Sequence, residues 1–99
     1  MTDFIYYGEL FNIYKSLLNE SNCKYYSLYY EENLSLQEIA DIENVSKSYV
    51  GNLIKKTTEK LIEYEKNLQI YESKKKLKEI VELTDLEKIK KEINKIIAW

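Results

Sequence analysis

The side chains with the clearest chemical potential are polar and basic groups that follow one another closely after residue 45. The amide of Asn52 can form two hydrogen bonds with an adenine edge, and Lys47 can contact guanine or a phosphate. Lysines further along can contact phosphates, which adds affinity without sequence information. A solvated helix face is the alternative explanation for these lysines. The residues expected to contact DNA are Ser46, Lys47, Ser48, Tyr49, Asn52, Lys55 and Lys56.

A short helix and a turn precede these residues. The run Ser35–Glu38 has the sequence of a capping box, in which the serine caps a helix start and the glutamate reaches back to the serine amide. Asn44 is well suited to a left-handed turn, and Ser46 can cap the next helix. Two helices joined by about three residues predict a helix-turn-helix, whose second helix presents its first residues to the major groove.

Ala40 stands where a small side chain lets the second helix pack closely on the first. Gly51 is unfavourable there, because glycine costs about 1 kcal/mol in a helix interior. Glu43 occupies a position that is usually apolar in such units, and we expect the neighbouring Ile42 to replace that contact. The apolar residues expected around the helix-turn-helix are Ile39, Val45, Val50 and Leu53.

The composition favours an all-α fold. The chain has 99 residues, no proline and two glycines, and these two residue types interrupt helices most strongly. Apolar residues at spacings of three and four predict helices over 4–18 and 19–32, then a long helix from 46 to 71. A bend is expected in the lysine-rich stretch 73–78, and the capping-box sequence Thr84–Glu87 opens a last helix. The expected organisation is a helix-turn-helix part over 1–72 and a helical extension over 73–99 of the same domain.

The long apolar stripe and the apolar last helix predict a homodimer, since such faces need a partner surface. The residues expected at its interface are Leu61, Tyr64, Leu68, Tyr71, Ile93 and Trp99.

Charge and composition exclude several classes of protein. The net charge is −2, but residues 1–45 carry −6 and residues 46–99 carry +4, so the basic half contains the expected DNA-contacting residues. With no histidine and a single cysteine, we expect no disulfide, metal or cofactor. No glycine-rich phosphate loop or activated nucleophile is apparent, so we expect no enzyme. The start of the chain does not read as a signal peptide and no apolar run suits a membrane span, so a cytoplasmic location is expected.

Several runs of the sequence, spread over about residues 4–83, together resemble one known family. They are 12–18, 25–30, 34–40, 45–47, 52–57 and the set Leu61, Tyr64, Glu65 and Leu68. These runs resemble the YlxM family, which is bacterial. The resemblance implies a fold similar to the promoter-reading C-terminal region of sigma factors, without a wing, and a DNA-binding role in transcription regulation. The sequence departs from the family in two respects: lysine stands near residues 47 and 56 where the family usually has arginine, and Gly51 stands where the family has a bulkier residue.

The resemblance also implies a part in the signal recognition particle (SRP) pathway, because the family's gene tends to neighbour those of the particle's GTPases. The expected function is therefore a helix-turn-helix DNA-binding regulator that takes part in this pathway. The alternative is a protein- or RNA-interaction module of the targeting machinery without sequence-specific DNA binding. Its partners would be the SRP GTPase or the SRP RNA, whose phosphates the lysines of 74–78 could contact, although a solvated charge run explains these lysines too.

Overall fold

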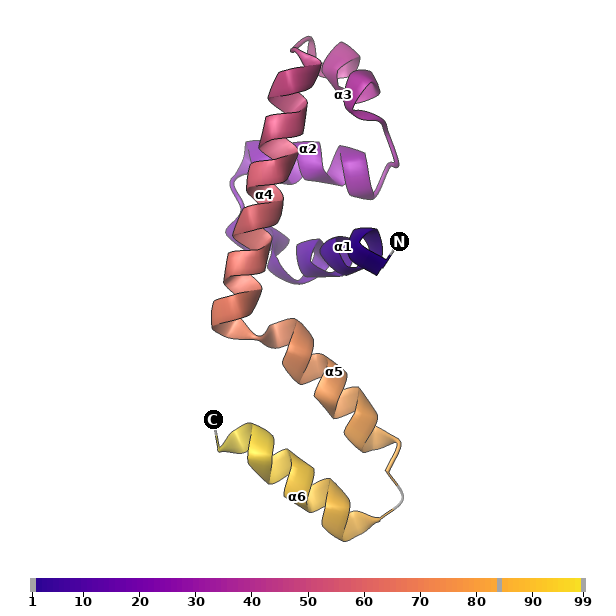
Figure 1. Ribbon diagram of the computed structural model, residues 1–99, viewed down its shortest axis with the longest axis vertical. Helices are drawn as coiled ribbons and strands as arrows, with labels where there is room; N and C mark the ends of the chain where they lie inside the picture. Colours follow the sequence, from indigo (N-terminus) through magenta and orange to yellow (C-terminus); the bar gives the residue numbers. More distant parts are fainter. Residues whose placement is uncertain (1, 84, 99) are drawn as a thin grey trace. The chain divides into compact units, whose positions relative to one another are not determined.

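The structure is a computed structural model that describes residues 2–83 and 85–98. Within these ranges the chain forms helices joined by short connections and contains no β-strand (Figure 1). The expected all-α fold is confirmed. The chain divides into two compact units, unit 1 (Met1–Leu68) and unit 2 (Gln69–Trp99), which are described separately. The helices are α1 (Thr2–Tyr14), the 3-10 helix η1 (Lys15–Leu17), α2 (Glu20–Tyr30), α3 (Leu36–Glu43), α4 (Lys47–Leu68), α5 (Ile70–Val81) and α6 (Leu86–Ile97).

Short polar side chains fix where the helices of unit 1 begin. Asn19 caps α2, its Oδ1 accepting a hydrogen bond from the amide of Asn22 at 2.8 Å. Ser35 and Glu38 form the expected capping box at α3, with the serine Oγ 3.1 Å from the Glu38 amide and Glu38 Oε1 2.9 Å from the Ser35 amide. The hydrogen bonds from Ser35 to the Glu38 carboxylate lower the pKa of that group.

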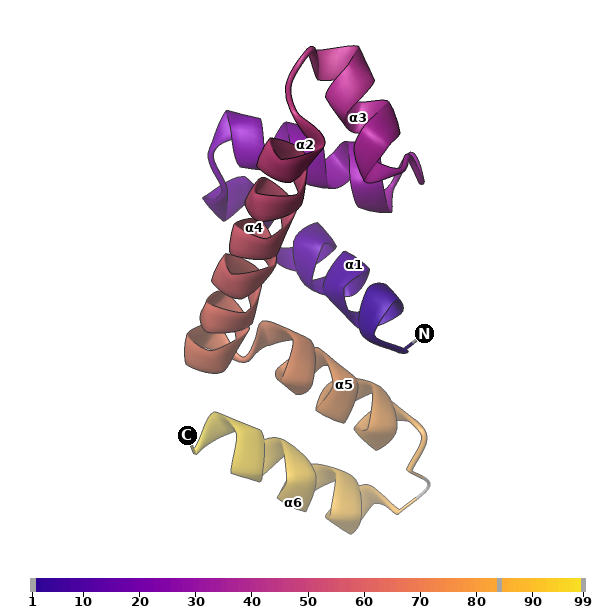
Figure 2. The ribbon, with the colours of Figure 1, turned by 45° about the horizontal axis from the view of Figure 1, so that its top comes forward.

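The core of unit 1 forms where α4 packs against α1, α2 and α3 (Figures 1 and 2). One face of α4 supplies buried residues at steps of three and four, as a helix that buries a single stripe must. The opposite face of α4 remains in solvent. The side chains of this core are Leu10, Phe11, Tyr14, Tyr25, Tyr26, Ile39, Ala40, Val50, Ile54, Thr57 and Leu61.

Buried polar groups in this core are paired across helices. The Tyr14 hydroxyl on α1 donates to Glu65 Oε1 on α4 at 2.5 Å. The Tyr26 hydroxyl lies 2.7 Å from Thr58 Oγ1, and Thr58 donates to the Ile54 carbonyl at 2.9 Å, so Tyr26 is the donor to Thr58. Because an unpaired buried polar group is costly, these bonds favour one register of α4 against α1 and α2.

Unit 1 is expected to lose stability in alkali. Burial raises the pKa of the Tyr26 phenol above its ordinary value. A group with a raised folded-state pKa contributes stability below the unfolded pKa, here about 10, and loses that contribution as the pH rises through the folded value. The unfolding free energy measured in urea should therefore fall above about pH 10. Tyr26→Phe should lose about 1 kcal/mol at neutral pH and show a shallower alkaline decline; an equally steep decline would contradict this account.

The helix α4 ends at Leu68, so the expected continuation of this helix to Tyr71 is wrong. Gln69 adopts a left-handed conformation with φ of 53° and turns the chain into α5. Tyr71 therefore lies on α5. The two compact units divide between Leu68 and Gln69, whereas the sequence analysis placed a boundary after residue 72. The bend expected at 73–78 is also wrong, since α5 is helical throughout that stretch.

Unit 2 is a pair of helices, α5 and α6, that contact each other. Among the described residues of these two helices, Ile80 on α5 is the one that is buried. Asp85 caps α6, its Oδ1 accepting from the amides of Glu87 at 2.9 Å and Lys88 at 3.4 Å. Thr84, the first residue of the expected capping box, lies outside the described residues. Among the described helices, none combines the length and apolar character needed to cross a membrane.

Gly51 is not required by the packing of α4. A Cβ atom added there would lie 3.7 Å from Leu36 Cδ1, an ordinary van der Waals distance. Gly51→Ala should therefore raise the unfolding free energy by about 0.5–1 kcal/mol, because alanine loses less backbone entropy in a helix. Urea denaturation followed by circular dichroism measures this, and a destabilised variant would show that α3 and α4 approach more closely at this point.

Candidate nucleic-acid interface

Three residues, Asn44, Val45 and Ser46, join α3 to α4, as expected for a helix-turn-helix. Asn44 has the predicted left-handed conformation, with φ of 57° and ψ of 47°. The Ala40 carbonyl accepts hydrogen bonds from the amides of Asn44 and Val45. Ser46 Oγ accepts from the Tyr49 amide at 3.0 Å. Hydrogen bonds on both sides of the turn therefore fix the direction in which α4 leaves it.

Small and apolar side chains hold α3 against α4. Ala40 and Ile39 on α3 and Val50 on α4 are buried, as the sequence predicted. Val45 and Leu53 are half-buried. The closeness of this packing depends on the small volume of Ala40, which lies in the interior with 1% of its surface exposed.

The expectation that Ile42 replaces an apolar contact at Glu43 is wrong. Ile42 is 61% exposed, whereas the Glu43 side chain is mostly buried and its carboxylate lies 2.8 Å from Lys24 Nζ on α2. This hydrogen-bonded ion pair raises the pKa of Lys24. An ion pair thus connects α3 to α2 where related units use an apolar side chain.

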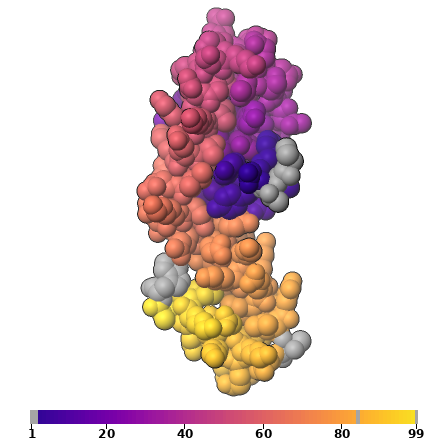
Figure 3. All heavy atoms as spheres, in the orientation of Figure 1, coloured from indigo at the N-terminus to yellow at the C-terminus, as the bar shows by residue number. Residues whose placement is uncertain are grey.

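All seven residues predicted to contact DNA are exposed, Ser46 just before α4 and the others within its first three turns. Figure 3 shows the surface of the molecule coloured along the sequence, with this part of the chain in the magenta to rose shades. We call the surface that these seven residues form the α4 outer face. Tyr49 is 49% exposed, and its ring meets Tyr25 edge-on at 6.0 Å between centroids, which supports one side of the face. Its members are Ser46, Lys47, Ser48, Tyr49, Asn52, Lys55 and Lys56.

Acidic residues border the basic part of this face, and the sequence analysis did not identify them. Glu59 and Glu63 are exposed and follow Lys55 and Lys56 at helical spacing on α4. On α3, Glu38 and Asp41 are exposed as well. The helical spacing of these acids was a visible signal, but counting charge over whole halves of the chain concealed it. Beyond about the first three turns of α4, exposed lysines such as Lys60 alternate with these acids, so the purely basic part of the face lies in those turns.

The residues predicted for a dimer interface belong to both units and differ in exposure. Leu61 is fully buried in the core of unit 1, so its assignment to an interface is wrong. Tyr64 is half-buried, its ring 5.9 Å from that of Tyr14 and its hydroxyl donating to the Leu17 carbonyl at 3.3 Å. Leu68 is exposed at the end of α4, and Ile93 is 37% exposed on α6 in unit 2. Tyr71 is half-buried on α5, and Trp99 lies outside the described residues.

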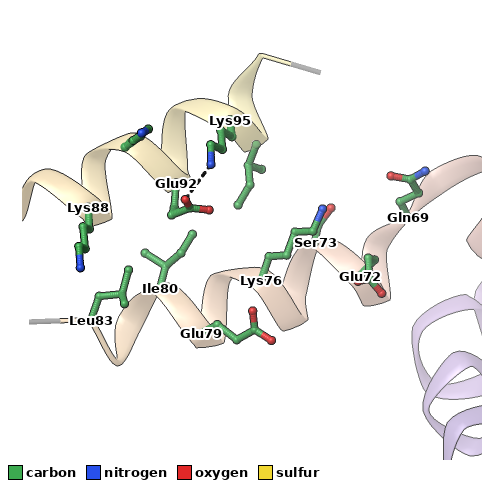
Figure 4. Close-up of a pocket in the computed structure, with 12 residues that line it drawn as sticks. Gln69, Glu72, Ser73, Lys76, Glu79, Ile80, Leu83, Lys88, Glu92 and Lys95 are labelled. Atoms are coloured by element: carbon green, nitrogen blue, oxygen red, sulfur yellow. Dashed lines mark hydrogen bonds and ion pairs between the residues drawn. The ribbon is translucent and has the colours of Figure 1, made fainter. Parts of the chain in front are cut away.

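The lysines of 74–78 all lie on α5. Lys74, Lys75 and Lys78 are exposed, and Lys76 lines a groove of about 720 Å³ between α5 and α6. Figure 4 draws the lysines and glutamates that line this groove on both helices, and Lys95 Nζ lies 3.0 Å from Glu92 Oε1. The groove thus carries mixed charge and is not a simple phosphate-binding surface. Its charged lining residues are Glu72, Lys76, Glu79, Lys88, Lys91, Glu92 and Lys95.

A family profile described as "Putative helix-turn-helix protein, YlxM / p13 like" matches residues 1–98. The chain belongs to the YlxM / p13-like family. The resemblance to YlxM drawn from the sequence runs is therefore confirmed, and the helix-turn-helix seen at α3 and α4 agrees with the family description. A helix-turn-helix family points to a non-enzymatic role for this YlxM / p13-like chain.

Relatives of this YlxM / p13-like chain match it over most of their length. A UPF0122 protein of Ureaplasma urealyticum serovar 10 is 40% identical over 83 residues, which are 83% of this chain and 84% of the relative. A UPF0122 protein of Fusobacterium nucleatum is 36% identical over 99 residues, covering 98% of this chain and 94% of the relative. One from Mycoplasma capricolum is 36% identical over 97 residues, or 93% and 86% of the two chains.

Proposed function

We propose that this chain is a regulator that binds DNA through the α4 outer face. The observation that carries the proposal is that all seven predicted contact residues are exposed at the start of a helix whose direction is fixed by a capped turn. That arrangement suits insertion of the first turns of α4 into the major groove. A transcription-regulating role of this kind belongs in the cytoplasm of a bacterium.

The side chains of the α4 outer face have different roles in the proposed contact with DNA. Lys47, Lys55 and Lys56 supply positive charge for phosphates, which strengthens binding to any sequence. Asn52 is the residue that can read a base edge through paired hydrogen bonds. Lysine is a point charge without arginine's planar fork, so sequence preference should depend more on Asn52 than on the lysines.

Selection from a random DNA pool, followed by retardation at several salt concentrations, tests the proposal. We expect enrichment of a common sequence and an affinity that falls with salt, with a log–log slope of about −0.9 for each phosphate contacted. Failure to retain any DNA at low salt would contradict the proposed function.

The exposed acids of α3 favour a second candidate, a protein- or RNA-interaction module of the SRP targeting machinery. Glu38 and Asp41 lie in the helix that crosses the DNA backbone in helix-turn-helix complexes, where negative charge opposes phosphate. Exposed lysines on α5 could contact RNA instead. Crosslinking followed by pull-down, run beside the DNA selection, separates the two candidates. Recovery of the particle's GTPase or RNA without salt-dependent DNA retardation would favour the second.

We further propose that the protein is a homodimer and that unit 2 supplies most of the interface. Helical segments this short rarely bury enough apolar surface alone. Both α5 and α6 expose apolar side chains at spacings of seven and four residues, none of which lines the groove. They replace Leu61 in the proposed interface, and Ile93 stays in it. These exposed side chains are Ile70, Leu77 and Val81 on α5, and Leu86, Ile93 and Ile97 on α6.

Ile93→Glu should convert the dimer to a monomer, because a charge on the apolar face is costly to bury. Asn94→Glu is the matched control, since it adds the same charge at the next, exposed position of α6. Sedimentation equilibrium measures the mass of each variant. A monomeric unmodified protein at micromolar concentration, or dissociation by both variants alike, would refute this interface.

A further inference from the structure

Tyr49 is the aromatic residue of the α4 outer face. The other members of this face are serines, lysines and an asparagine, so the Tyr49 ring is the large apolar surface among them. The residue is 49% exposed. Its amide donates to Ser46 Oγ at 3.0 Å, which places it in the capped first turn of α4. A helix that enters the major groove presents its first residues to the base edges.

The Tyr49 ring is supported from the inside of unit 1. Tyr25 of α2, which is buried, lies 6.0 Å from it between centroids, with the two ring planes at 73°. Aromatic pairs of this geometry are favourable. Lys24, next to Tyr25 on α2, pairs with Glu43 at the end of α3, so α2 is connected close to the turn from which α4 starts. The ring is therefore restrained on its inner side, while half of the residue stays in solvent.

Asn52, the proposed reader of an adenine edge, is the neighbour of Tyr49 on the same helix face. It lies three residues further along α4 and is exposed. Side chains three residues apart on a helix are about 5–6 Å apart at their Cβ atoms, and successive base pairs are about 3.4 Å apart along the DNA axis. Tyr49 can therefore reach a base at most about two base pairs from the one that Asn52 contacts.

We propose that Tyr49 recognises the C5 methyl group of a thymine within about two base pairs of the adenine that Asn52 contacts. This inference rests on the proposed function, in which the α4 outer face binds DNA. The thymine methyl is the apolar group that a base edge presents in the major groove, and apolar side chains contact it. The hydroxyl groups of the serines and the charged ends of the lysines offer no comparable apolar surface.

Replacing single thymines of the selected DNA by deoxyuridine tests the proposal. Deoxyuridine keeps the base pair and its hydrogen-bonding edge, and lacks only the methyl group. At one thymine, the affinity of the full chain should fall roughly fourfold, the effect expected for burying one methyl-sized group. Fluorescence anisotropy at a fixed salt concentration measures the affinity for each DNA. Equal affinity for the thymine DNA and for every substituted DNA would overturn the role assigned to Tyr49.

Three variants assign the methyl effect to the Tyr49 ring. Tyr49→Ala should bind the thymine and deoxyuridine DNAs equally, whereas Tyr49→Phe should keep the ratio of the two affinities, because it keeps the ring. Lys47→Ala is the control in the same turn: it should weaken binding to both DNAs and leave the ratio unchanged. Because the ratio compares two DNAs with one protein sample, partial loss of folded protein does not alter it. A ratio that persists in Tyr49→Ala, or one that disappears in Tyr49→Phe, would overturn the assignment.

The role of Tyr49 and the proposed function fail in different ways. Absence of binding to any DNA at low salt would overturn the proposed function and the role of Tyr49 with it. Salt-dependent binding of a selected sequence that is insensitive to the thymine methyl would leave the proposed function in place and overturn only the role of Tyr49.

Discussion

Reversing the charges of Lys47 and Lys55 together should abolish DNA binding and leave the helical content unchanged. Both side chains are exposed at the start of α4 and neither takes part in the core. Each substitution removes a phosphate contact and adds a like charge beside the phosphates, so affinity near 0.1 M salt should fall roughly a hundredfold or more. Fluorescence anisotropy with labelled DNA measures the affinity, and circular dichroism measures the helical content.

A matched variant separates local contact from overall charge. Lys75→Glu with Lys91→Glu changes the net charge equally, but its residues lie on α5 and α6. This control should retain most of the affinity. Persistent binding by Lys47→Glu with Lys55→Glu would show that the contact surface has been placed wrongly. Equal loss in both variants would show that binding responds only to net charge.

Truncating Leu61 to alanine should cost unit 1 about 2–5 kcal/mol of unfolding free energy, the usual range for a large apolar side chain removed from a packed core. Leu61 is completely buried on the inner face of α4, so its loss leaves a cavity. Leu68→Ala is the matched control, because Leu68 belongs to the same helix but is 44% exposed. We expect that variant to lose less than about 1 kcal/mol.

Urea unfolding at two protein concentrations measures the unfolding free energies of Leu61→Ala and Leu68→Ala. The loss in Leu61→Ala should be the same at both concentrations, because the cavity forms within one chain. A variant that stays as stable as the control but dissociates into monomers would restore Leu61 to an interface between copies.

Local signals in the sequence predicted the helix-turn-helix well. The capping box at Ser35 and Glu38, the left-handed Asn44 and the capping Ser46 each depend on residues within four positions, so tertiary packing is not needed to recognise them. Burial of Ala40 followed from the same pattern. The seven exposed residues of the α4 outer face were also found, because the apolar stripe of α4 left them on the opposite side.

Features that depend on tertiary packing were not predicted. The apolar stripe of α4 showed that Leu61 needs a partner surface, but not that α1 and α2 of the same chain provide it. The break after Leu68 had no visible cause either, because a glutamine in left-handed conformation replaces the glycine that usually ends a helix. Likewise, the pairing of Tyr14 with Glu65 joins residues 51 positions apart in the chain.

The most direct test of the account is an NMR titration of the labelled protein with the DNA sequence enriched by selection. We predict that the largest amide shifts fall between Ser46 and Lys56, and that they weaken as salt is raised. Shifts centred on α1 or on the helices of unit 2, with the amides of the α4 outer face unchanged, would contradict the assignment of α4 as the helix that contacts DNA.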